Sequence, residues 1–464
     1  MKTNDYSRYM SPFSWRYGSE KMRRIFSEEN KYRLWRKVWV ALAKAEAKEG
    51  LVSKEELADL EKHQNDIDIE RIWEIEKDTR HDVVAAIKEF SEKAKIGGGK
   101  IHLGATSMDI TDNAETVRIQ EALLVIEDEL KKLLKAFGQK IEKYADFPCM
   151  GYTHLQPAEP TTLGYRFAFY AQDLLMDLEL LQFVKKNLKS KGMKGAVGTS
   201  ASYVRLLDQK RAKEMEKEVL AKLELEAFEI TNQTAPRKIE FWVASLLAGV
   251  TQSLNKFAFD VRFMQSPGLR EWEEPFSKSQ VGSSAMPFKR NPIKAEQICS
   301  LARLVVSLSR IPWDNAASQL LERTLDDSAN RRVVIPEMFL AVDEMLSSAT
   351  NLLDGLMIYE EVTRKNLEFF FAFSTSEVIL MEAVKKGADR QKMHEILREI
   401  SMKAWQEMHS GRENPMGNLI LASKEIKKYL SAADIKKILD LKNYTGNATQ
   451  KSDELTEKIK KISL

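Results

Sequence analysis

The sequence predicts a mainly α-helical protein, and three observations lead to this expectation. Apolar residues recur at spacings of three and four over long stretches, which is the period of an amphipathic helix. Segments that alternate like strands are scarce in the 464 residues. Several predicted helices exceed about 25 residues, beyond the usual length in globular proteins. Helices this long carry more apolar surface than one chain easily covers, so we expect a bundle shared between subunits, with a bundle inside one chain as the alternative.

Five helices can be placed in order. The first follows Tyr32 and stops at Gly50, a residue that favours helix ends. Asp112, followed three residues later by Glu115, predicts a capping box for the second helix. The other three are predicted from near Thr161–Thr162 to about Asn187, from Pro236 to about Met264, and from Pro292 onward. Polar breaks near 107–112 and 358–365 predict three domains, at 1–110, 111–360 and 361–464.

Composition excludes several classes of protein. With 72 Lys and Arg against 69 Asp and Glu, the net charge is only +3, too little for a general nucleic-acid binder. The two cysteines, Cys149 and Cys299, exclude a disulfide scaffold and a cysteine-ligated zinc module. No set of residues has metal-ligand spacing, and no run approaches the roughly 18 apolar residues of a membrane span. We therefore expect a soluble cytoplasmic protein with no metal.

The most unusual loop is Gly282–Pro292, which reads GSSAMPFKRNP. Two cations stand just ahead of a predicted helix, whose N-terminus also favours an anion. Ser283 beside Lys289 could lose its proton more easily than a serine in water, because the alkoxide would be stabilised by charge. An ordinary surface loop with a helix cap is the alternative for such a composition.

Four other segments carry candidate chemistry. His154, placed just before a predicted helix, suits proton transfer near neutral pH, although a lone loop histidine is more often structural. The segments 80–82 and 102–109 combine histidine with cations, carboxylates or hydroxyls. The segment 322–332 is rich in arginine, which favours carboxylates and phosphates, with exposed ion pairs as the alternative.

Together these loops resemble the fumarase/aspartase superfamily, whose signature is Gly-Ser-Ser-x-Met-Pro-x-Lys-x-Asn-Pro. The eight specified residues would match by chance with a probability on the order of 10⁻¹⁰ per position. Within the superfamily the chain is similar to the adenylosuccinate lyase family. Five further motifs match that family in order, namely Arg16-Tyr17, Thr79–Asp82, Gly104–Ser107, Thr153–Pro157 and Glu322–Ser328.

The resemblance implies a homotetramer of three-domain, mainly helical subunits with a central bundle of long helices. Each active site would be built from loops of three subunits. The implied reaction is a β-elimination that releases fumarate from adenylosuccinate, giving AMP, and from the succinyl-carboxamide ribotide SAICAR, giving AICAR, without a cofactor. The alternatives are argininosuccinate lyase or another fumarate-releasing lyase of the superfamily, and, in a different class, a non-catalytic helical oligomer.

The resemblance also assigns roles to residues. Ser283 is the general base and His154 the general acid; Lys289 stabilises the alkoxide, and Glu296 orients the histidine. The residues that match substrate-binding positions are Arg16, Tyr17, Arg80, His81, Asp82, His102, Thr106, Ser107, Gln233, Ser284, Met286, Asn291, Arg323, Ser328 and Arg332.

Two positions depart from the family pattern. Phe288 stands where many bacterial relatives have His and others Tyr, and Gln297 stands where close relatives often carry Arg. We therefore expect one polar contact and one cation near the ligand to be missing.

Overall fold

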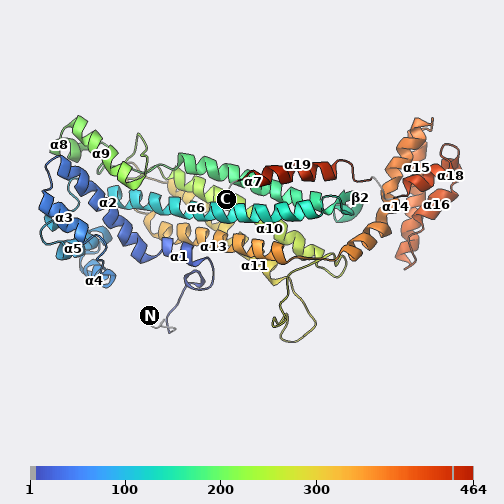
Figure 1. The fold of residues 1–464 in the computed structure, drawn as a ribbon, viewed down its shortest axis with the longest axis horizontal. Helices are drawn as coiled ribbons and strands as arrows, with labels where there is room; N and C mark the ends of the chain where they lie inside the picture. The colour runs from blue at the N-terminus through green and yellow to red at the C-terminus, as the bar shows by residue number, and fades with distance from the viewer. Residues whose placement is uncertain (1–6, 441–443, 463–464) are drawn as a thin grey trace. The chain divides into compact units, whose positions relative to one another are not determined.

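The computed structural model describes residues 7–440 and 444–462, and it confirms a mainly helical chain (Figure 1). Among these residues the strands form only two small antiparallel sheets, β1 (Pro148–Thr153) with β2 (Gln156–Thr162), and β3 (Trp272–Glu273) with β4 (Met357–Ile358). The described helices of 25 residues or more are α6 (Ser107–Lys143), α7 (Leu163–Asn187), α10 (Lys238–Met264), α13 (Ser328–Gly355) and α14 (Glu360–Lys385). No helix in the described ranges has the length and apolar character needed to span a membrane.

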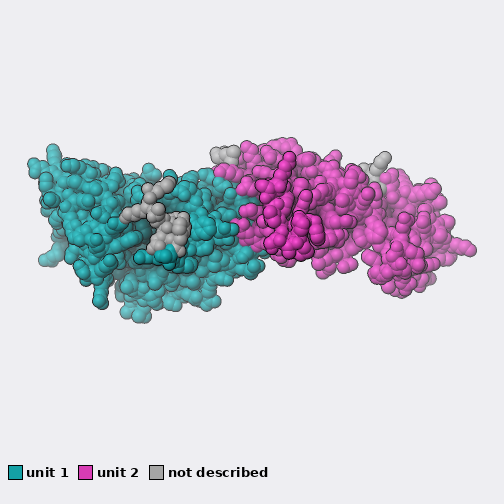
Figure 2. Space-filling model, turned by 90° about the horizontal axis from the view of Figure 1, so that it is seen from below, with its two compact units in different colours: residues 1–130, 176–255, 298–348 teal, residues 131–175, 256–297, 349–464 magenta. Residues whose placement is uncertain are grey.

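The chain divides into two units, coloured separately in Figure 2. Unit 1 comprises residues 1–130, 176–255 and 298–348, and unit 2 comprises residues 131–175, 256–297 and 349–464. Both units receive residues from α6, α7, α10, α13 and α11 (Ile293–Leu308). The predicted division into three domains, at 1–110, 111–360 and 361–464, stays a prediction.

Unit 1 contains most of the short helices. They are η1 (Pro12–Ser14), α1 (Glu20–Ile25), α2 (Glu28–Lys48), α3 (Lys54–Lys62), α4 (Ile69–Thr79), α5 (Asp82–Lys93), η2 (Gly98–Lys100), α8 (Ala201–Leu206), α9 (Gln209–Leu223) and α12 (Arg310–Ala317). Helix α2 begins before the predicted Tyr32, because the Ser27 side chain caps it by accepting the amide of Asn30. It ends where predicted, before Gly50 in the left-handed conformation.

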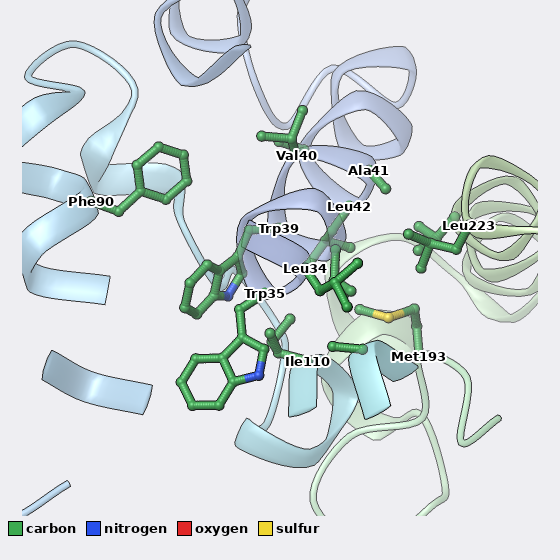
Figure 3. Close-up of a cluster of buried hydrophobic side chains, with 14 of the residues drawn as sticks. Leu34, Trp35, Trp39, Val40, Ala41, Leu42, Phe90, Ile110, Met193 and Leu223 are labelled. Carbon is green, nitrogen blue, oxygen red and sulfur yellow. The ribbon is translucent and has the colours of Figure 1, made fainter. Parts of the chain in front are cut away.

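The core of unit 1 is built around α2 (Figure 3). Leu34, Trp35 and Trp39 are at most 5% exposed, and around them Figure 3 shows residues of other elements of the same unit, among them Phe90 of α5 and Leu223 of α9. Burying a side chain of this size stabilises the folded state by roughly 1.5–3 kcal/mol. The ends of α4, α5 and α6 therefore pack on this buried hydrophobic core.

The long helices also contact one another within unit 1. Gln182 of α7 donates to Glu127 of α6 at 2.8 Å, and Ser253 of α10 donates to Asp177 of α7 at 2.6 Å. Buried polar groups of this kind must be hydrogen-bonded, so they fix the register of neighbouring helices. The predicted bundle of long helices is confirmed in this unit.

In unit 2, the parts of α6, α7 and α10 that belong to it pack against one another through aromatic rings. Phe137 of α6 and Tyr170 of α7 lie 5.2 Å and 5.4 Å from Phe257 of α10. A second cluster, which includes Ile379 and Ile435, joins α14 to the C-terminal helices. These are α15 (Arg390–His409), α16 (Met416–Ala422), α17 (Lys424–Lys427) and α18 (Ala432–Ile438), and α19 (Ala448–Lys460) follows them in the chain.

The predicted capping box at Asp112 is wrong. Helix α6 begins at Ser107, and Asp112 is a buried residue inside it whose carboxylate accepts the amide of Ala235 at 2.8 Å. The contact typical of a cap lies three residues earlier, where Asp109 accepts the amide of Thr106 at 3.0 Å. The spacing of Thr106 and Asp109 is visible in the sequence, but the periodicity of the apolar residues does not distinguish a helix start there from one at Asp112.

Candidate active site

The Ser283 hydroxyl oxygen is an acceptor for two backbone amides. Met286 donates to it at 3.0 Å and Ala285 at 3.3 Å. Hydrogen bonds to the charged form of a group favour that form, so both amides would stabilise an alkoxide at this position. Lys289 is exposed on the same loop, and its amide donates to the carbonyl of Met286 at 3.1 Å. The loop can therefore present a serine oxygen, two fixed amides and a cation together.

The two ends of this loop are joined at a neck. The side-chain amide of Asn291 donates to the carbonyl of Gly282 at 3.0 Å. A Cβ atom at Gly282 would lie 2.0 Å from the carbonyl oxygen of Lys289, so only glycine fits there. Beyond the neck, α11 begins at Ile293 as predicted, and Glu296 is exposed on its first turn. Phe288, one of the two departures, is 81% exposed.

His154 lies at the tip of the β1–β2 hairpin, not just before a helix as predicted. Thr153 pairs with Gln156, and the two residues between them have left-handed backbones, with φ of 53° at His154 and 60° at Leu155. This is the geometry of a type I′ turn, which Asn and Gly usually occupy. Strand β2 separates the turn from α7, which begins at Leu163. The turn holds the histidine side chain exposed, at a cost in backbone strain.

The four predicted catalytic residues, Ser283, His154, Lys289 and Glu296, all belong to unit 2. Among the described residues no hydrogen bond or ion pair connects any two of their side chains. The orientation of His154 by Glu296 therefore stays a prediction. Ser284 and Met286, two predicted binding residues of the loop, are both exposed.

In unit 1 the structure brings Asp82 and Arg332 together. The guanidinium of Arg332 donates to the Asp82 carboxylate at 2.7 Å across 250 positions of sequence. Arg80, in the left-handed conformation, ends α4, and His81 precedes the first turn of α5. Both side chains are exposed. Three cationic or titratable groups (Arg80, His81 and Arg332) and the Asp82 carboxylate thus lie in one region of unit 1.

His102 is held in one neutral form. The indole of Trp39 donates to its Nδ1 at 3.1 Å, so this nitrogen carries no proton and the Nε2 atom carries one. Burial lowers the pKa of the ring to about 4, and nearby Asp109 opposes this shift. The residue has a φ of 70°. His102 is therefore fixed as a hydrogen-bond donor at Nε2.

Asp109 organises the start of α6, where the predicted Thr106 and Ser107 lie. It is fully buried and forms an ion pair with Lys191, which is buried as well. Its carboxylate accepts the amides of Lys194 and Gly195, each at 3.1 Å, in addition to that of Thr106. Asp109 lies in the candidate segment 102–109, but the sequence alone indicated no role for it. Its place three residues after Thr106, the spacing of a helix cap, is the signal that could have found it.

The arginine-rich segment forms buried ion pairs, so the alternative of exposed pairs is wrong for its central residues. Arg323 donates to Asp327 at 2.8 Å, and Asp327 accepts from Arg237 at 2.8 Å. Burial raises the pKa of the Asp327 carboxyl, but the guanidinium groups around it outweigh this and hold the pKa below its usual range. The amide of Gln233 donates to the carbonyl of Glu322 at 3.2 Å. The predicted binding residues Gln233 and Arg323 thus lie on two neighbouring loops, and Ser328 follows Asp327 at the start of α13.

Arg16 and Tyr17 stand apart from these groups. The Arg16 guanidinium carbon lies 5.7 Å from the Tyr17 ring centroid. The segment that follows is anchored on α13, because the amide of Ser19 donates to Asp343 at 2.5 Å and that of Gly18 to Glu344 at 3.1 Å. No described hydrogen bond or ion pair connects Arg16 or Tyr17 to the other predicted binding residues.

Comparisons with known proteins give the same family. A family model described as "Lyase" matches residues 16–307, and a model of the "Adenylosuccinate lyase C-terminus" matches 372–455. A protein named adenylosuccinate lyase from Saccharomyces cerevisiae is 36% identical, with 98% of this chain and 95% of that protein covered. One with the same name from Methanocaldococcus jannaschii is 38% identical, with 97% and 96% covered.

The chain belongs to the adenylosuccinate lyase family.

Solved structures confirm the fold of the wider superfamily. A fumarate lyase from Mesorhizobium sp. BNC1 has a TM-score of 0.84 at 24% identity, covering 97% of this chain and 99% of that one. A 3-carboxy-cis,cis-muconate lactonizing enzyme from Pseudomonas putida has the same TM-score at 23% identity. At this identity the likeness concerns the fold alone, because one fold hosts many reactions. It supports the predicted fumarase/aspartase-like subunit.

Among the described residues no group of three or more His, Cys, Asp or Glu side chains is arranged to hold a metal ion. The adenylosuccinate lyase C-terminus match begins inside α14 and ends inside α19, and the sequence carries no recognised motif in its main part, helices α14 to α18. These helices are joined by apolar core positions, which carry no chemical signal.

We predict that His102 makes unfolding pH-dependent. Its pKa is about 4 in the folded chain and near 6.5 when unfolded, so below about pH 6.5 the unfolded state binds a proton that the folded state does not. This contribution to stability is present above pH 6.5 and is lost as the pH falls towards 4. In His102→Asn, which keeps an acceptor for Trp39 and tolerates the left-handed backbone, the urea midpoint should fall less between these pH values.

The matched control is His394→Asn, on the exposed face of α15. It should keep the pH dependence of the unchanged chain. An identical pH dependence in His102→Asn and the unchanged chain would contradict the prediction.

Proposed function

We propose that this chain is a carbon–nitrogen lyase that eliminates fumarate from adenylosuccinate, giving AMP, and from SAICAR, giving AICAR. The observation that carries the proposal is its similarity, over at least 95% of its length, to relatives named adenylosuccinate lyase. The signature loop supplies the chemistry that such an elimination needs.

The reaction requires a base, an acid and a stabilised anion. Ser283 takes a proton from the carbon next to a carboxylate, and the electron pair passes into that carboxylate. The pair then forms the double bond of fumarate as the carbon–nitrogen bond breaks, and His154 protonates the leaving nitrogen. Acid and base each contribute about 10²–10⁴-fold, and fixed donors and cations around the carbanion contribute much of the rest.

Two features support Ser283 as the base. The amides of Ala285 and Met286 already point at its oxygen, so no reorganisation is needed when it loses its proton. Lys289 adds a positive charge on the same loop. His154 suits the acid because the hairpin turn exposes its ring, and Glu296 is proposed to orient that ring in the assembled protein.

The proposed binding residues match the charge of the substrate, which carries a phosphate and two carboxylates and so about four negative charges. Cations for these groups would come from Arg16, Arg80, His81, Arg323 and Arg332, with hydrogen-bond donors from Tyr17, His102, Thr106, Ser107, Gln233, Ser284, Asn291 and Ser328, and apolar contact from Met286. Asp82 would act through Arg332, which it already holds.

We propose a homotetramer whose sites are shared between subunits. Large apolar side chains are exposed along α7, at spacings that place them on one side of the helix, namely Tyr165, Phe169, Met176, Leu180 and Phe183. Exposed apolar surface of this extent is typical of a face that another chain covers. The two cysteines are free and buried, which fits the reducing cytoplasm that we propose as its location.

The first test is release of fumarate, followed by its absorbance. We expect release from adenylosuccinate and from SAICAR but not from argininosuccinate. Argininosuccinate has no phosphate, so it would not use the cations of unit 1. Turnover of argininosuccinate without turnover of adenylosuccinate would contradict the proposal.

Ser283→Ala and His154→Ala should each lower kcat by at least about 100-fold while leaving the fold intact, because each removes one proton-transfer group. Steady-state kinetics measure the effect, and circular dichroism checks the fold. The matched controls are Ser277→Ala, an exposed serine ahead of the loop, and His394→Ala. Near-normal turnover in either active-site variant would remove that residue from its role.

Mixing the two inactive variants should restore part of the activity if sites are shared. In mixed tetramers some sites combine an intact Ser283 from one subunit with an intact His154 from another. The measurement is kcat after the variants are mixed, partly unfolded and refolded together. Absence of any recovery, with mixed tetramers shown by mass spectrometry, would indicate sites made by single chains.

A further inference from the structure

The four-residue segment Glu271–Glu274 lies between α10 and the signature loop, in unit 2. Its two central residues form β3, which pairs with β4. Trp272 is 1% exposed and stacks on Phe167 of α7, with ring centroids 5.3 Å apart. The pairing with β4 and the buried Trp272 therefore fix the segment. Its glutamates are then held in place to contact neighbouring elements.

Glu271 faces the hairpin that carries His154. It is fully buried, and its carboxylate lies 3.6 Å from the guanidinium of Arg166 and accepts from the hydroxyl of Tyr152 at 3.5 Å. Arg166 in turn donates to the carbonyl of Met150 at 2.5 Å. Tyr152 and Met150 are both residues of β1, so two contacts fix this strand immediately before the turn.

Glu274 faces the other way, to the base of the signature loop. It is 4% exposed, and its carboxylate accepts the amides of Lys294 at 3.0 Å and Ala295 at 2.6 Å. These amides belong to the first turn of α11, directly after the loop. Glu273 adds an ion pair with Arg290 at 2.6 Å, inside the loop itself.

Gln265 completes the connection between segment and loop. Its side-chain oxygen accepts the amide of Glu274 at 3.0 Å, and its side-chain nitrogen donates to the carbonyl of Arg290 at 3.0 Å. Together with the ion pair of Glu273, this fixes Arg290 through both its backbone and its side chain.

Burying these carboxylates has a cost. Burial raises the pKa of both Glu271 and Glu274, which means that their charged forms are less stable there than in water. An apolar side chain would fill the same space without that cost. The carboxylates add directional hydrogen bonds. Each accepts from donors that lie next to a loop, and so each fixes the position of that loop.

We infer that Glu271 and Glu274 are positioning residues for the proposed reaction: from the two ends of one segment, they hold the hairpin that carries His154 and the loop that carries Ser283. The inference rests on the proposed function for its kinetic consequence. Its structural part, the dependence of the two loops on these carboxylates, stands without that function.

The test of Glu274 compares Glu274→Ala with Glu274→Gln. Alanine offers no acceptor to the two amides, whereas glutamine keeps an oxygen. We expect kcat for adenylosuccinate to fall by about 10-fold or more in the alanine variant and by less in the glutamine variant, with KM within about threefold in both, because a small misplacement of a catalytic group affects the reacting geometry most.

The matched control is Asp389→Ala, which removes the side chain that caps α15 by accepting the amide of Lys392. It removes an exposed acceptor for one amide of a first helical turn, so its melting temperature should fall while kcat stays unchanged. A kcat within threefold of the unchanged chain in Glu274→Ala, or a fall of similar size in Asp389→Ala, would overturn the role of Glu274.

Glu271→Gln should also lower kcat with little change in KM. Because this variant could fail to fold beside the buried Arg166, Tyr152→Phe serves as the second variant. It removes one donor to the same carboxylate, and we expect a fall of about threefold in kcat. Unchanged kcat in Tyr152→Phe would overturn the role of Glu271.

Hydrogen exchange measured by mass spectrometry separates the two proposals. Peptides covering 282–297 should exchange faster in Glu274→Ala than in the unchanged chain, and peptides covering 148–162 should do so in Tyr152→Phe. If the unchanged chain released no fumarate, the proposed function would be wrong. Hydrogen exchange would still test whether Glu271 and Glu274 position the two loops. Unchanged exchange in both variants would overturn the positioning itself.

Discussion

The buried ion pair between Asp109 and Lys191 is the interaction on which the start of α6, with the predicted binding residues Thr106 and Ser107, depends. Neither group contacts water, so each must be compensated inside the protein. Asp109 achieves this by accepting amides from both the start of α6 and the loop at 194–195. The positions of Thr106 and Ser107 follow from that arrangement, because the Thr106 amide donates to the Asp109 carboxylate and Ser107 is the next residue.

The same device recurs in unit 2, where Glu274 accepts the first amides of α11. In both units a buried carboxylate fixes the start of a helix, and candidate residues lie at that start or in the loop just ahead of it. A second shared property is backbone strain. Arg80, His102 and His154 are among the few non-glycine residues of the described chain with positive φ. Side chains on such turns are aimed by the backbone, and a tightly packed surrounding is needed to keep them there.

The sequence was sufficient where the signal is local. Apolar periods and prolines placed the starts of α10 and α11 within two residues, and the contiguous loop Gly282–Pro292 was enough to predict the superfamily. It was insufficient where the signal is a distant contact. Nothing local indicates that Asp82 meets Arg332, or that Glu274 caps a helix twenty residues on. The hairpin of His154 was missed because its strands contain Pro157 and Pro160, which argue against strands. The catalytic roles themselves remain predictions.

The neck between Gly282 and Asn291 has a consequence for the entropy of ligand capture. The hydrogen bond across it makes the residues between them a closed ring rather than an open tether. Much of the conformational entropy that an open loop would lose on binding an anion has already been lost during folding. The loss of conformational entropy when this loop binds an anion is therefore smaller than its length suggests.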